Sequence, residues 1–359
     1  MNLVFTGGGS GGHVYPAIAL IKILKQRDPT VHVLYIGKQG AFEERICKQE
    51  KIPFHPIDVT YLYRKKWYKN IGTIRRFIKA KKEVKRILKQ FQADVVIGTG
   101  GYVSGPVLMA AKALNIRIII HEQNSVPGLT NRWLSRYADW VALSFPESKR
   151  FFKKAKTVVT GNPRGYEVKH ADKRDKRVLG LDPKRKLLLI FFGSQGGKYI
   201  NRKIAELLPF LDRLEDCEIL FVTGAAHYED MMARLQGQLL KRTRVLPYLD
   251  DMPYYMAVAD FVICRAGATT IAELLALGKP ALYIPSPHVT NDHQTKNAAM
   301  ITNRGAGVLV KEEDFNREAV LQLIVELLRD EDKREAMGKR AQALSNAEGI
   351  EQFIQLIYH

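Results

Sequence analysis

The sequence has few cysteines, no long apolar run and a shortage of acidic residues. Its 359 residues include three cysteines, Cys47, Cys217 and Cys264, which are far apart and odd in number. This pattern excludes a disulfide framework and a cysteine metal site, and it favours buried thiols in a reducing compartment. The longer apolar runs, such as 187–192, are far below the ~18 residues that would span a bilayer. The N-terminus enters an apolar strand without a charged leader region, so we expect no signal peptide.

The shortage of acidic residues is concentrated in one segment. The chain has 56 Lys and Arg against 37 Asp and Glu, a formal net charge of +19. Residues 64–89 contain twelve Lys or Arg and one acid, Glu83, and so supply +11 of that charge. A local excess of this kind indicates an anionic partner: nucleic acid, an acidic membrane or a phosphorylated substrate. No recognised nucleic-acid module accompanies it, so we do not expect nucleic acid.

Short apolar runs alternate with helical patterns along the whole chain. Their continuous apolar character is typical of parallel strands that are buried on both faces. In the first half we expect strands at 3–6, 31–36, 94–97, 117–120, 139–143 and 157–159. In the second half we expect them at 187–192, 218–222, 243–246, 260–263, 280–284 and 307–310. The repeated pattern predicts an α/β chain of two doubly wound, Rossmann-like domains.

A Gly-Asn-Pro turn at 161–163 marks the expected domain boundary. The predicted domains are therefore 1–162 and 163–342. The helical pattern at the end of the chain is longer than one domain needs. We expect its last part, helix 343–359, to pack back onto the first domain.

A glycine-rich turn follows the first predicted strand. Gly7-Gly-Gly-Ser-Gly-Gly-His13 separates strand 3–6 from a helical pattern. Glycines let the backbone approach a ligand, and a helix N-terminus supplies N–H groups and partial positive charge. The turn predicts a phosphate or diphosphate site with His13 as a candidate base. A nicotinamide dinucleotide is not expected, because the second strand ends in Gly37-Lys38 instead of an acidic residue.

Further glycine-rich segments follow later strands, at 98–106, 192–197 and 265–270. Ligands of doubly wound folds bind beyond the carboxyl ends of the strands. The segment 265–270 also opens a helix, and so it offers a second helix N-terminus. Anion-binding turns in both domains favour a donor that contains a diphosphate.

These segments resemble the MurG glycosyltransferases of family 28. The stretches that carry the resemblance run in the family's order over nearly the whole chain. They are GGGSGGHVYPAIAL at 7–20, GGYVSGP at 100–106, HEQNSVPGLTNRWL at 121–134, GNP at 161–163, GSQG at 193–196, YLDDM at 248–252, CRAGATTIAELLALGKPAL at 264–282 and HQTKNA at 293–298.

The resemblance implies a GT-B fold, in which two Rossmann-like domains face each other across a cleft. It implies transfer of N-acetylglucosamine from UDP-GlcNAc to the 4-hydroxyl of the muramyl sugar of lipid I, with inversion, giving lipid II and UDP. It implies a peripheral enzyme at the cytoplasmic face of the cell membrane, acting in peptidoglycan synthesis without a metal or cofactor, with other cell-wall synthesis or division proteins as partners. A UDP-sugar transferase of the same fold that acts on another lipid, such as diacylglycerol, is the alternative.

The resemblance also implies a role for individual residues. His13 is the expected catalytic base, with Glu122 or a water as alternatives. The implied donor-binding residues are Ser10, Gly11, Gly12, Asn124, Arg164, Ser194, Leu249, Ala268, Thr269, Thr270, Glu273 and Gln294. The implied acceptor or diphosphate residues are Gly9, Tyr102 and Ser104. Among the donor residues, Glu273 is expected at the ribose hydroxyls, Gln294 at the hexosamine and Leu249 at the uracil.

Several positions have a structural alternative. Tyr102 and Ser104 can shape a turn, and His121 and Glu122 can support the loop that follows them. Arg164 comes directly after Pro163, one place earlier than in the family, and Phe192 stands where the family has a glycine. The shift of the arginine predicts a weaker contribution to diphosphate binding. His288 and His293 lack a third ligand at metal spacing, so no metal site is expected.

The segment 61–69 mixes aromatic and basic residues. Aromatic rings favour the membrane interface, and cations are attracted to anionic headgroups. The predicted membrane-contact residues are Leu62, Arg64, Lys65, Lys66, Trp67, Tyr68 and Lys69. The helix that follows has an apolar stripe of Ile71, Ile74, Phe77, Ile78, Val84, Ile87 and Leu88, which we expect to face the core of the domain.

Overall fold

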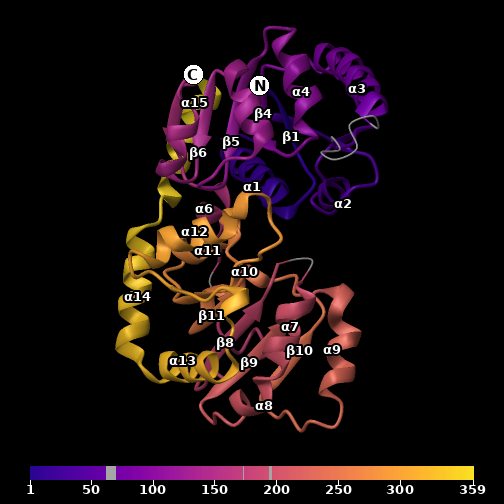
Figure 1. Ribbon diagram of the computed structural model, residues 1–359. Helices are drawn as coiled ribbons and strands as arrows, with labels where there is room; N and C mark the ends of the chain where they lie inside the picture. The colour runs from indigo at the N-terminus through magenta and orange to yellow at the C-terminus, as the bar shows by residue number, and fades with distance from the viewer. Residues whose placement is uncertain (62–69, 173, 194–195) are drawn as a thin grey trace. The chain divides into compact units, whose positions relative to one another are not determined.

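The computed structural model describes residues 1–61, 70–172, 174–193 and 196–359 (Figure 1). The chain divides into two compact units, and each is built on one parallel sheet. Unit 1 comprises Met1–Glu167 together with Asn346–His359, and unit 2 comprises Val168–Ser345. The predicted fold class of two Rossmann-like α/β domains is confirmed.

The sheet of unit 1 has seven strands in the order β3-β2-β1-β4-β5-β6-β7. These strands are β1 (Asn2–Gly7), β2 (His32–Lys38), β3 (Phe54–Ile57), β4 (Val95–Gly100), β5 (Arg117–Glu122), β6 (Trp140–Leu143) and β7 (Thr157–Val159). Alternate side chains of β1 enter two separate buried clusters, Leu3 and Phe5 in one and Val4 in the other. Helices therefore cover both faces of this sheet, as the continuous apolar strands predict.

The apolar pattern does not predict β3. Its sequence, Phe54-His-Pro-Ile57, contains a proline, which has no N–H to donate to a neighbouring strand. The strand is tolerated because it lies at the edge of the sheet and pairs with β2 alone, with Tyr35 opposite Phe54. The other predicted strands of both units are present, with ends that differ by at most three residues.

The α-helices of unit 1 are α1 (Gly11–Arg27), α2 (Phe42–Gln49), α3 (Asn70–Gln90), α4 (Ser104–Lys112), α5 (Leu129–Leu134) and α15 (Ile350–Tyr358), and α6 (Pro163–Lys169) crosses the boundary between the units. Short 3-10 helices occupy Ser135–Tyr137, Pro146–Phe151 and Ala347–Gly349.

Helix α3 only partly matches the expected packing. Val84, Ile87 and Leu88 are buried as predicted, but Ile71, Ile74 and Ile78 are 58%, 52% and 60% exposed. At 100° per residue, 71, 74 and 78 lie on one side of the helix and 80, 84 and 87 lie on the other. The apolar residues therefore form two opposed stripes, and the expectation that all of them face the core is wrong for the three isoleucines.

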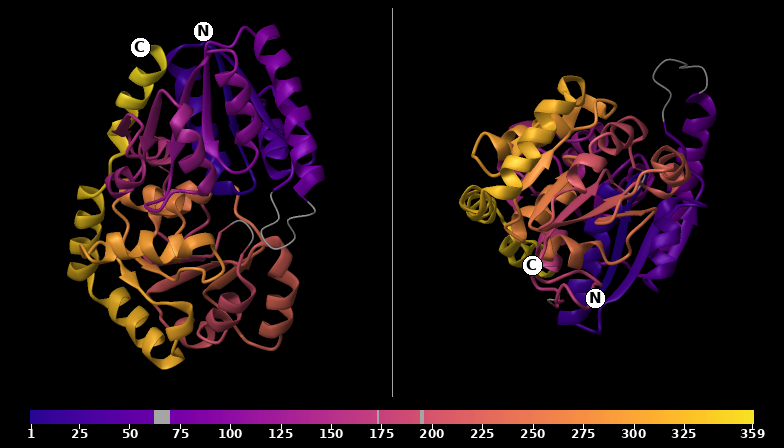
Figure 2. Two further views of the ribbon diagram at one scale, coloured as in Figure 1. Left: turned by 45° about the horizontal axis from the view of Figure 1, so that its top comes forward. Right: turned by 90° about the horizontal axis from the view of Figure 1, so that it is seen from below.

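Helix α15 belongs to unit 1 although it follows unit 2 in the sequence. Its residues Ile350, Phe353 and Ile357 are buried in the same cluster as Leu3 and Phe5 of β1. The ring of Phe353 lies 5.5 Å from that of His121 on β5, measured between centroids. Figure 2 shows the yellow helix running along the indigo and magenta unit.

The sheet of unit 2 has six strands in the order β10-β9-β8-β11-β12-β13. They are β8 (Lys186–Phe191), β9 (Cys217–Val222), β10 (Thr243–Leu246), β11 (Phe261–Cys264), β12 (Ala281–Tyr283) and β13 (Val308–Leu309). The helices are α7 (Lys198–Ala205), α8 (Leu208–Leu211), α9 (Tyr228–Leu235), α10 (Met252–Val258), α11 (Ala268–Ala276), α12 (His293–Thr302), α13 (Arg317–Arg329) and α14 (Glu331–Ala343), with 3-10 turns at Ala225–His227, Thr290–Asp292 and Glu312–Asp314.

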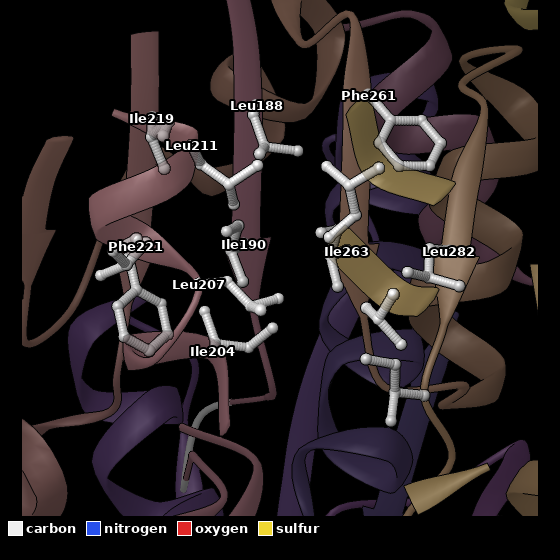
Figure 3. Packing of buried hydrophobic residues seen from close by; sticks show 14 of the residues in the cluster. Leu188, Ile190, Ile204, Leu207, Leu211, Ile219, Phe221, Phe261, Ile263 and Leu282 are labelled. Carbon is white, nitrogen blue, oxygen red and sulfur yellow. The ribbon is translucent and has the colours of Figure 1, made fainter. Parts of the chain in front are cut away.

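The core of unit 2 is apolar. Inward residues of β8, β9 and β11, such as Ile190, Phe221 and Ile263, pack with Ile204 of α7 (Figure 3). Cys217 lies in this cluster, and Cys47 and Cys264 are also buried free thiols, as predicted. Among the described residues, no helix has the length and apolar character needed to cross a membrane.

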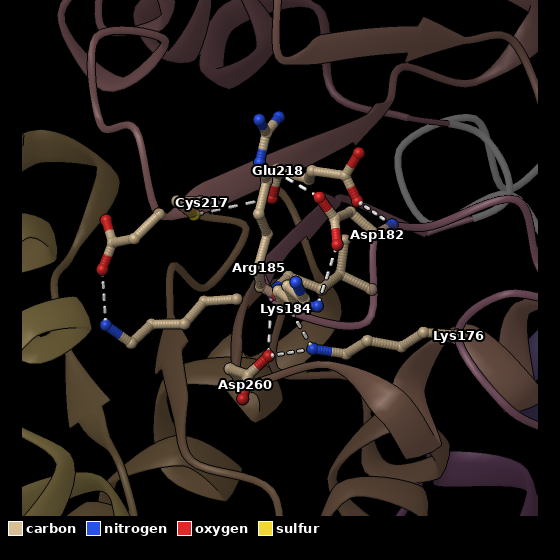
Figure 4. A network of polar contacts seen from close by, with 10 residues as sticks. Lys176, Asp182, Lys184, Arg185, Cys217, Glu218 and Asp260 are labelled. Carbon is tan, nitrogen blue, oxygen red and sulfur yellow. Dashed lines mark hydrogen bonds and ion pairs between the residues drawn. The ribbon is translucent and has the colours of Figure 1, made fainter.

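Charged residues form a network of hydrogen bonds where the strands of the unit 2 sheet begin (Figure 4). Asp260 accepts hydrogen bonds from Lys176 Nζ (2.9 Å) and from the backbone N–H of Leu187 (2.8 Å). Lys176 also donates to the carbonyl of Arg185 (2.8 Å), and Glu218 accepts from the N–H of Asp182 (2.8 Å). These contacts hold the polar stretch before β8 against the sheet, so its basic residues have a structural role.

The turns after β1 and β4 cross at very short range. The N–H of Gly8 donates to the carbonyl of Gly100 (3.2 Å). Gly101 has φ +82°, and a Cβ placed there would lie 2.2 Å from the carbonyl oxygen of Gly8. Any larger residue at this position would force the two turns apart.

We expect Gly101→Ala to destabilise unit 1 by ~2 kcal/mol or more, because the substitution combines a positive φ with a backbone clash. Gly72→Ala is the matched control, since a Cβ at Gly72 on α3 meets nothing within 4 Å. Denaturant unfolding would measure both. Equal midpoints for the two variants would show that the turns can separate at little cost.

We expect His121 to make unit 1 sensitive to acid. Burial lowers its pKa to about 4 from the ordinary value of 6.5. As the pH falls below 6.5 the unfolded chain binds the proton first, so stability is lost progressively down to about pH 4. Between pH 7 and pH 5 the loss is about 2 kcal/mol.

Denaturant unfolding at the two pH values, with His121→Asn, would isolate this contribution. The exposed His32 at the start of β2 provides the control variant His32→Asn. The prediction is contradicted when His121→Asn retains the full pH dependence of the unsubstituted protein.

Candidate functional site

The glycine turn of unit 1 leads directly into helix α1. Ser10 is the N-cap in an extended conformation, and its carbonyl accepts from the N–H groups of His13 (3.1 Å) and Val14 (3.3 Å). The Ser10 side chain makes no capping hydrogen bond, and Gly9, Ser10 and Gly12 are exposed. The turn therefore presents a helix N-terminus at the surface, which is the arrangement that binds phosphate.

His13 lies on the first turn of α1 and reaches the end of β4. Its Nδ1 is 3.0 Å from the carbonyl oxygen of Thr99 and 3.3 Å from Oε1 of Gln123. Because a backbone carbonyl can only accept, Nδ1 carries the proton and the basic lone pair of the ring is on Nε2. Thr99 also donates from Oγ1 to the carbonyl of His13 (2.7 Å). A neutral imidazole in this state can accept a proton from a bound hydroxyl.

Glu43 on α2 packs against the glycine turn and hydrogen-bonds to its backbone. This fully buried carboxylate accepts from the N–H of Lys38 (3.1 Å) and of Gly9 (3.4 Å). A Cβ at Gly8 would lie 2.3 Å from its Oε1. Sequence reasoning missed Glu43, because a lone glutamate on an amphipathic helix is usually exposed.

Glu122 organises the loop that carries Asn124. Its carboxylate accepts from the N–H of Asn124 (2.9 Å), the N–H of Gly128 (3.3 Å) and Nδ2 of Asn131 (2.9 Å). Burial raises the pKa of Glu122, while these hydrogen bonds act in the opposite direction. This geometry favours the expected supporting role over that of a base, since the carboxylate is buried and occupied.

The candidate acceptor residues of unit 1 differ in exposure. Tyr102 is half-buried, and its ring lies 6.2 Å from that of Tyr61, centroid to centroid. Ser104 is fully buried and donates from Oγ to the carbonyl of Gly101 (2.8 Å). This contact supports the turn-shaping role of Ser104, and its contact with an acceptor stays a prediction.

Arg164 is engaged by its own unit. Its guanidinium donates to Glu167 (2.6 Å) and lies over the ring of Tyr15, 5.8 Å from the centroid. The backbone N–H of Arg164 donates to Oδ1 of Asn162 (3.1 Å). The weaker contribution of Arg164 to diphosphate binding stays a prediction.

Unit 2 offers a second helix N-terminus at the carboxyl end of β11. Helix α11 begins at Ala268, after the N-cap Gly267. Oγ1 of Thr269 is buried and has no hydrogen-bond partner among the described residues. Glu273, one turn further on, is buried with 7% exposure. The turn therefore combines N–H groups, the Thr269 hydroxyl and a carboxylate within two helical turns.

Arg265 holds the turn before α11 in place. Its Nη1 donates to the carbonyls of Ile284 (3.0 Å) and Pro285 (2.9 Å) and forms a buried ion pair with Glu312. Its guanidinium also lies over the ring of Phe192, 5.5 Å from the centroid. Phe192 thus has a packing role in this chain at the position where the family has a glycine.

The remaining donor candidates of unit 2 lie on loops after its strands. Gln294, at the start of α12, accepts through Oε1 from the N–H of Ser286 (2.8 Å), which leaves its amide nitrogen as a donor. Leu249 is half-buried after β10, and Thr270 is half-buried on α11. Ser194 and the membrane candidates Leu62 and 64–69 lie outside the described residues.

The structure groups the candidates by unit. Gly9, Ser10, Gly11, Gly12, His13, Tyr102, Ser104, Asn124 and Arg164 belong to unit 1, and Leu249, Ala268, Thr269, Thr270, Glu273 and Gln294 belong to unit 2. Over the described ranges, no group of three or more His, Cys, Asp or Glu side chains is arranged to hold a metal ion.

Comparisons with known proteins cover both units. Residues 3–143 match the glycosyltransferase family 28 N-terminal domain, and residues 187–353 match the glycosyltransferase family 28 C-terminal domain. The solved structure of Acinetobacter baumannii MurG is 30% identical with a TM-score of 0.76, and the match covers 99% of this chain and 98% of that one.

Two curated relatives carry the name UDP-N-acetylglucosamine–N-acetylmuramyl-(pentapeptide) pyrophosphoryl-undecaprenol N-acetylglucosamine transferase. The protein of Halalkalibacterium halodurans is 42% identical over 99% of both chains. That of Bacillus subtilis is 41% identical over 96% of this chain and 95% of its own. With both domains matched and the similarity extending over nearly its full length, the chain belongs to glycosyltransferase family 28.

Proposed function

We propose that this chain transfers N-acetylglucosamine from UDP-N-acetylglucosamine to the 4-hydroxyl of the muramyl sugar of lipid I, giving lipid II and UDP. The observation that carries the proposal is the His13 imidazole, held through Nδ1 at a helix N-terminus in a chain with both family 28 domains. The names of the relatives describe this same transfer.

In the proposed reaction, His13 accepts the proton of the acceptor hydroxyl on Nε2. The hydroxyl oxygen forms the new bond to the anomeric carbon from the face opposite the diphosphate, and the bond from that carbon to the diphosphate oxygen breaks. The electron pair leaves with UDP, and the anomeric configuration inverts. A general base of this kind contributes a factor of ~10²–10⁴ in rate.

Unit 2 is the proposed donor site. The N-terminus of α11, with Ala268, Thr269 and Thr270, stabilises the diphosphate and the charge that develops as UDP leaves. Glu273 accepts from the ribose hydroxyls, and the amide nitrogen of Gln294 donates to the hexosamine. The hydroxyl of Thr269 supports this assignment, since it has no hydrogen-bond partner within the described part of the chain and a bound phosphate oxygen would supply one.

The outward face of α3 is the proposed contact with the cytoplasmic surface of the membrane. Arg75, Lys82, Arg86 and Lys89 lie at helical positions on the same side as the three exposed isoleucines. An apolar stripe flanked by cations is typical of a peripheral helix on anionic lipid. Such a contact brings the enzyme to a polyprenyl acceptor that cannot leave the bilayer. The predicted membrane contact of Leu62 and residues 64–69, which lie outside the described residues, stays part of this proposal.

Product analysis tests the activity directly. The protein is incubated with labelled UDP-N-acetylglucosamine and either lipid I or diacylglycerol, and the products are identified. We expect label on lipid I with a β-1,4 linkage. Label on diacylglycerol instead, or no transfer to either lipid, would overturn the proposal.

Two substitutions should separate the proposed roles. His13→Ala should lower kcat by ~10²–10⁴, because the base acts in the transition state. Glu273→Ala should mainly raise the donor KM, because a ribose contact is made equally in the ground and transition states. Steady-state kinetics with His32→Ala and Glu318→Ala, which alter exposed residues of units 1 and 2, provide the controls. A His13→Ala enzyme with kcat near that of the unsubstituted protein would remove His13 from the mechanism.

Replacing Ile71, Ile74 and Ile78 together with serine should weaken binding to anionic vesicles at least about tenfold, because each exposed isoleucine would lose its burial in lipid. Sedimentation with phosphatidylglycerol and with phosphatidylcholine vesicles, at low and high salt, measures this. Val178→Ser and Leu239→Ser, which remove exposed apolar residues of unit 2, are the controls. Unchanged binding of the triple variant would place the membrane contact elsewhere.

A further inference from the structure

A row of three side chains connects His13 to the interior of unit 1. Gln123 lies between His13 and His121, with Oε1 3.3 Å from Nδ1 of His13 and Nε2 3.1 Å from Nδ1 of His121. Gln123 and His121 are almost completely buried, at 1% and 0% exposure. Neither has a role in the reaction as proposed above.

Two backbone carbonyls and the ring of His121 together determine the orientation of the Gln123 amide. Its Nε2 donates to the carbonyls of Thr99 (2.8 Å) and His121 (3.3 Å), which can only accept. The reversed amide would place an oxygen against both carbonyls and a nitrogen against the protonated Nδ1 of His13. The only consistent arrangement directs Oε1 at His13.

His121 completes the arrangement on the other side of Gln123. Its Nε2 lies 3.1 Å from the carbonyl of Gly161, so Nε2 carries the proton and Nδ1 accepts from Gln123. A neutral His121 is required for this, because protonation of Nδ1 would set two donors against each other. Burial beneath Phe353 favours the neutral form, since it lowers the pKa of His121 to about 4.

We propose that Gln123 is a positioning residue for the base: its amide oxygen holds the Nδ1–H of His13, and His121 holds the amide in the orientation that makes this possible. The proposal rests on the proposed function of His13. When Nε2 accepts the proton of the acceptor hydroxyl, the ring becomes an imidazolium and Nδ1–H keeps both of its acceptors. Gln123 and Thr99 then stabilise the positive charge without gaining or losing a proton themselves.

The surroundings of His13 contain few other groups that could take this role. On β5, the ionisable residues are Arg117 at the start of the strand and His121 and Glu122 at its end, and the carboxylate of Glu122 is occupied by Asn124, Gly128 and Asn131. On α2, Glu43 faces the glycine turn. The end of β4 brings Thr99 and Gly100, and α5 brings the neutral Asn131.

Two substitutions of opposite effect test the proposal. Gln123→Glu places a carboxylate beside Nδ1 and stabilises the imidazolium, so the acidic limb of the kcat profile should move to higher pH by roughly one pH unit. Gln123→Leu removes the acceptor, so the same limb should move to lower pH, and kcat should fall ~10–100-fold. NMR titration of the His13 ring should show the same two directions without any substrate.

The exposed Gln49 on α2 supplies the controls Gln49→Glu and Gln49→Leu, which change charge and shape away from His13. The buried carboxylate of Gln123→Glu can impair folding, so His121→Leu provides an independent variant. It removes the side-chain acceptor of the Gln123 amide and leaves the two backbone acceptors, and it should move the His13 titration in the direction of Gln123→Leu by a smaller amount. Unchanged titration of His13, or movement in one direction for both Gln123 variants, would overturn the proposal. An active His13→Ala enzyme would instead overturn the assignment of His13 as base, while the NMR titration would still judge the role of Gln123.

Discussion

The candidate site of unit 1 depends on one backbone carbonyl, that of Thr99 at the end of β4. It accepts from Nδ1 of His13 and from Nε2 of Gln123, and so it joins helix α1 to β5 across β4. Parallel pairing makes this possible, because β1, β4 and β5 are neighbours whose carboxyl ends lie at one edge of the sheet. The glycines at the ends of β1 and β4 then let the two segments approach closely enough for His13 on α1 to reach the carbonyl of Thr99 on β4.

The sequence predicts the parts of the site that depend on local pattern. Strand, glycine turn and helix are read from neighbouring residues, and the turn before His13 lies where that pattern places it. The supporting residues could not be found in this way. Glu43 and Gln123 act through contacts that span 34 and 110 positions of the chain, and no spacing in the sequence signals either pairing.

The remaining differences also have physical causes. The edge position of β3 tolerates a proline that would exclude it from the middle of a sheet. On α3, helical spacing places the three isoleucines and the buried Val84 and Ile87 on opposite sides, and only the position of the sheet decides which of the two apolar stripes is covered. The sequence also does not tell a structural cation from an exposed one. Lys176 pairs with Asp260 and holds the stretch before β8 against the sheet of unit 2, whereas Arg75, Lys82, Arg86 and Lys89 of α3 are exposed.

Helix α15 has a consequence for the order of folding during synthesis. The ribosome releases residues 1–167 long before residues 346–359, and all of unit 2 is made in between. Until α15 arrives, the face of the first sheet that holds Phe5 is covered by α1 and α2 but lacks Ile350, Phe353 and Ile357, and exposed apolar surface of this kind is prone to aggregation. His121 lies against Phe353 of α15. The buried pair Gln123 and His121 is therefore enclosed only after all of unit 2 has been translated. A nascent chain therefore has its glycine turn and His13 early, whereas the buried network behind His13 is enclosed only after residues 346–359 are made.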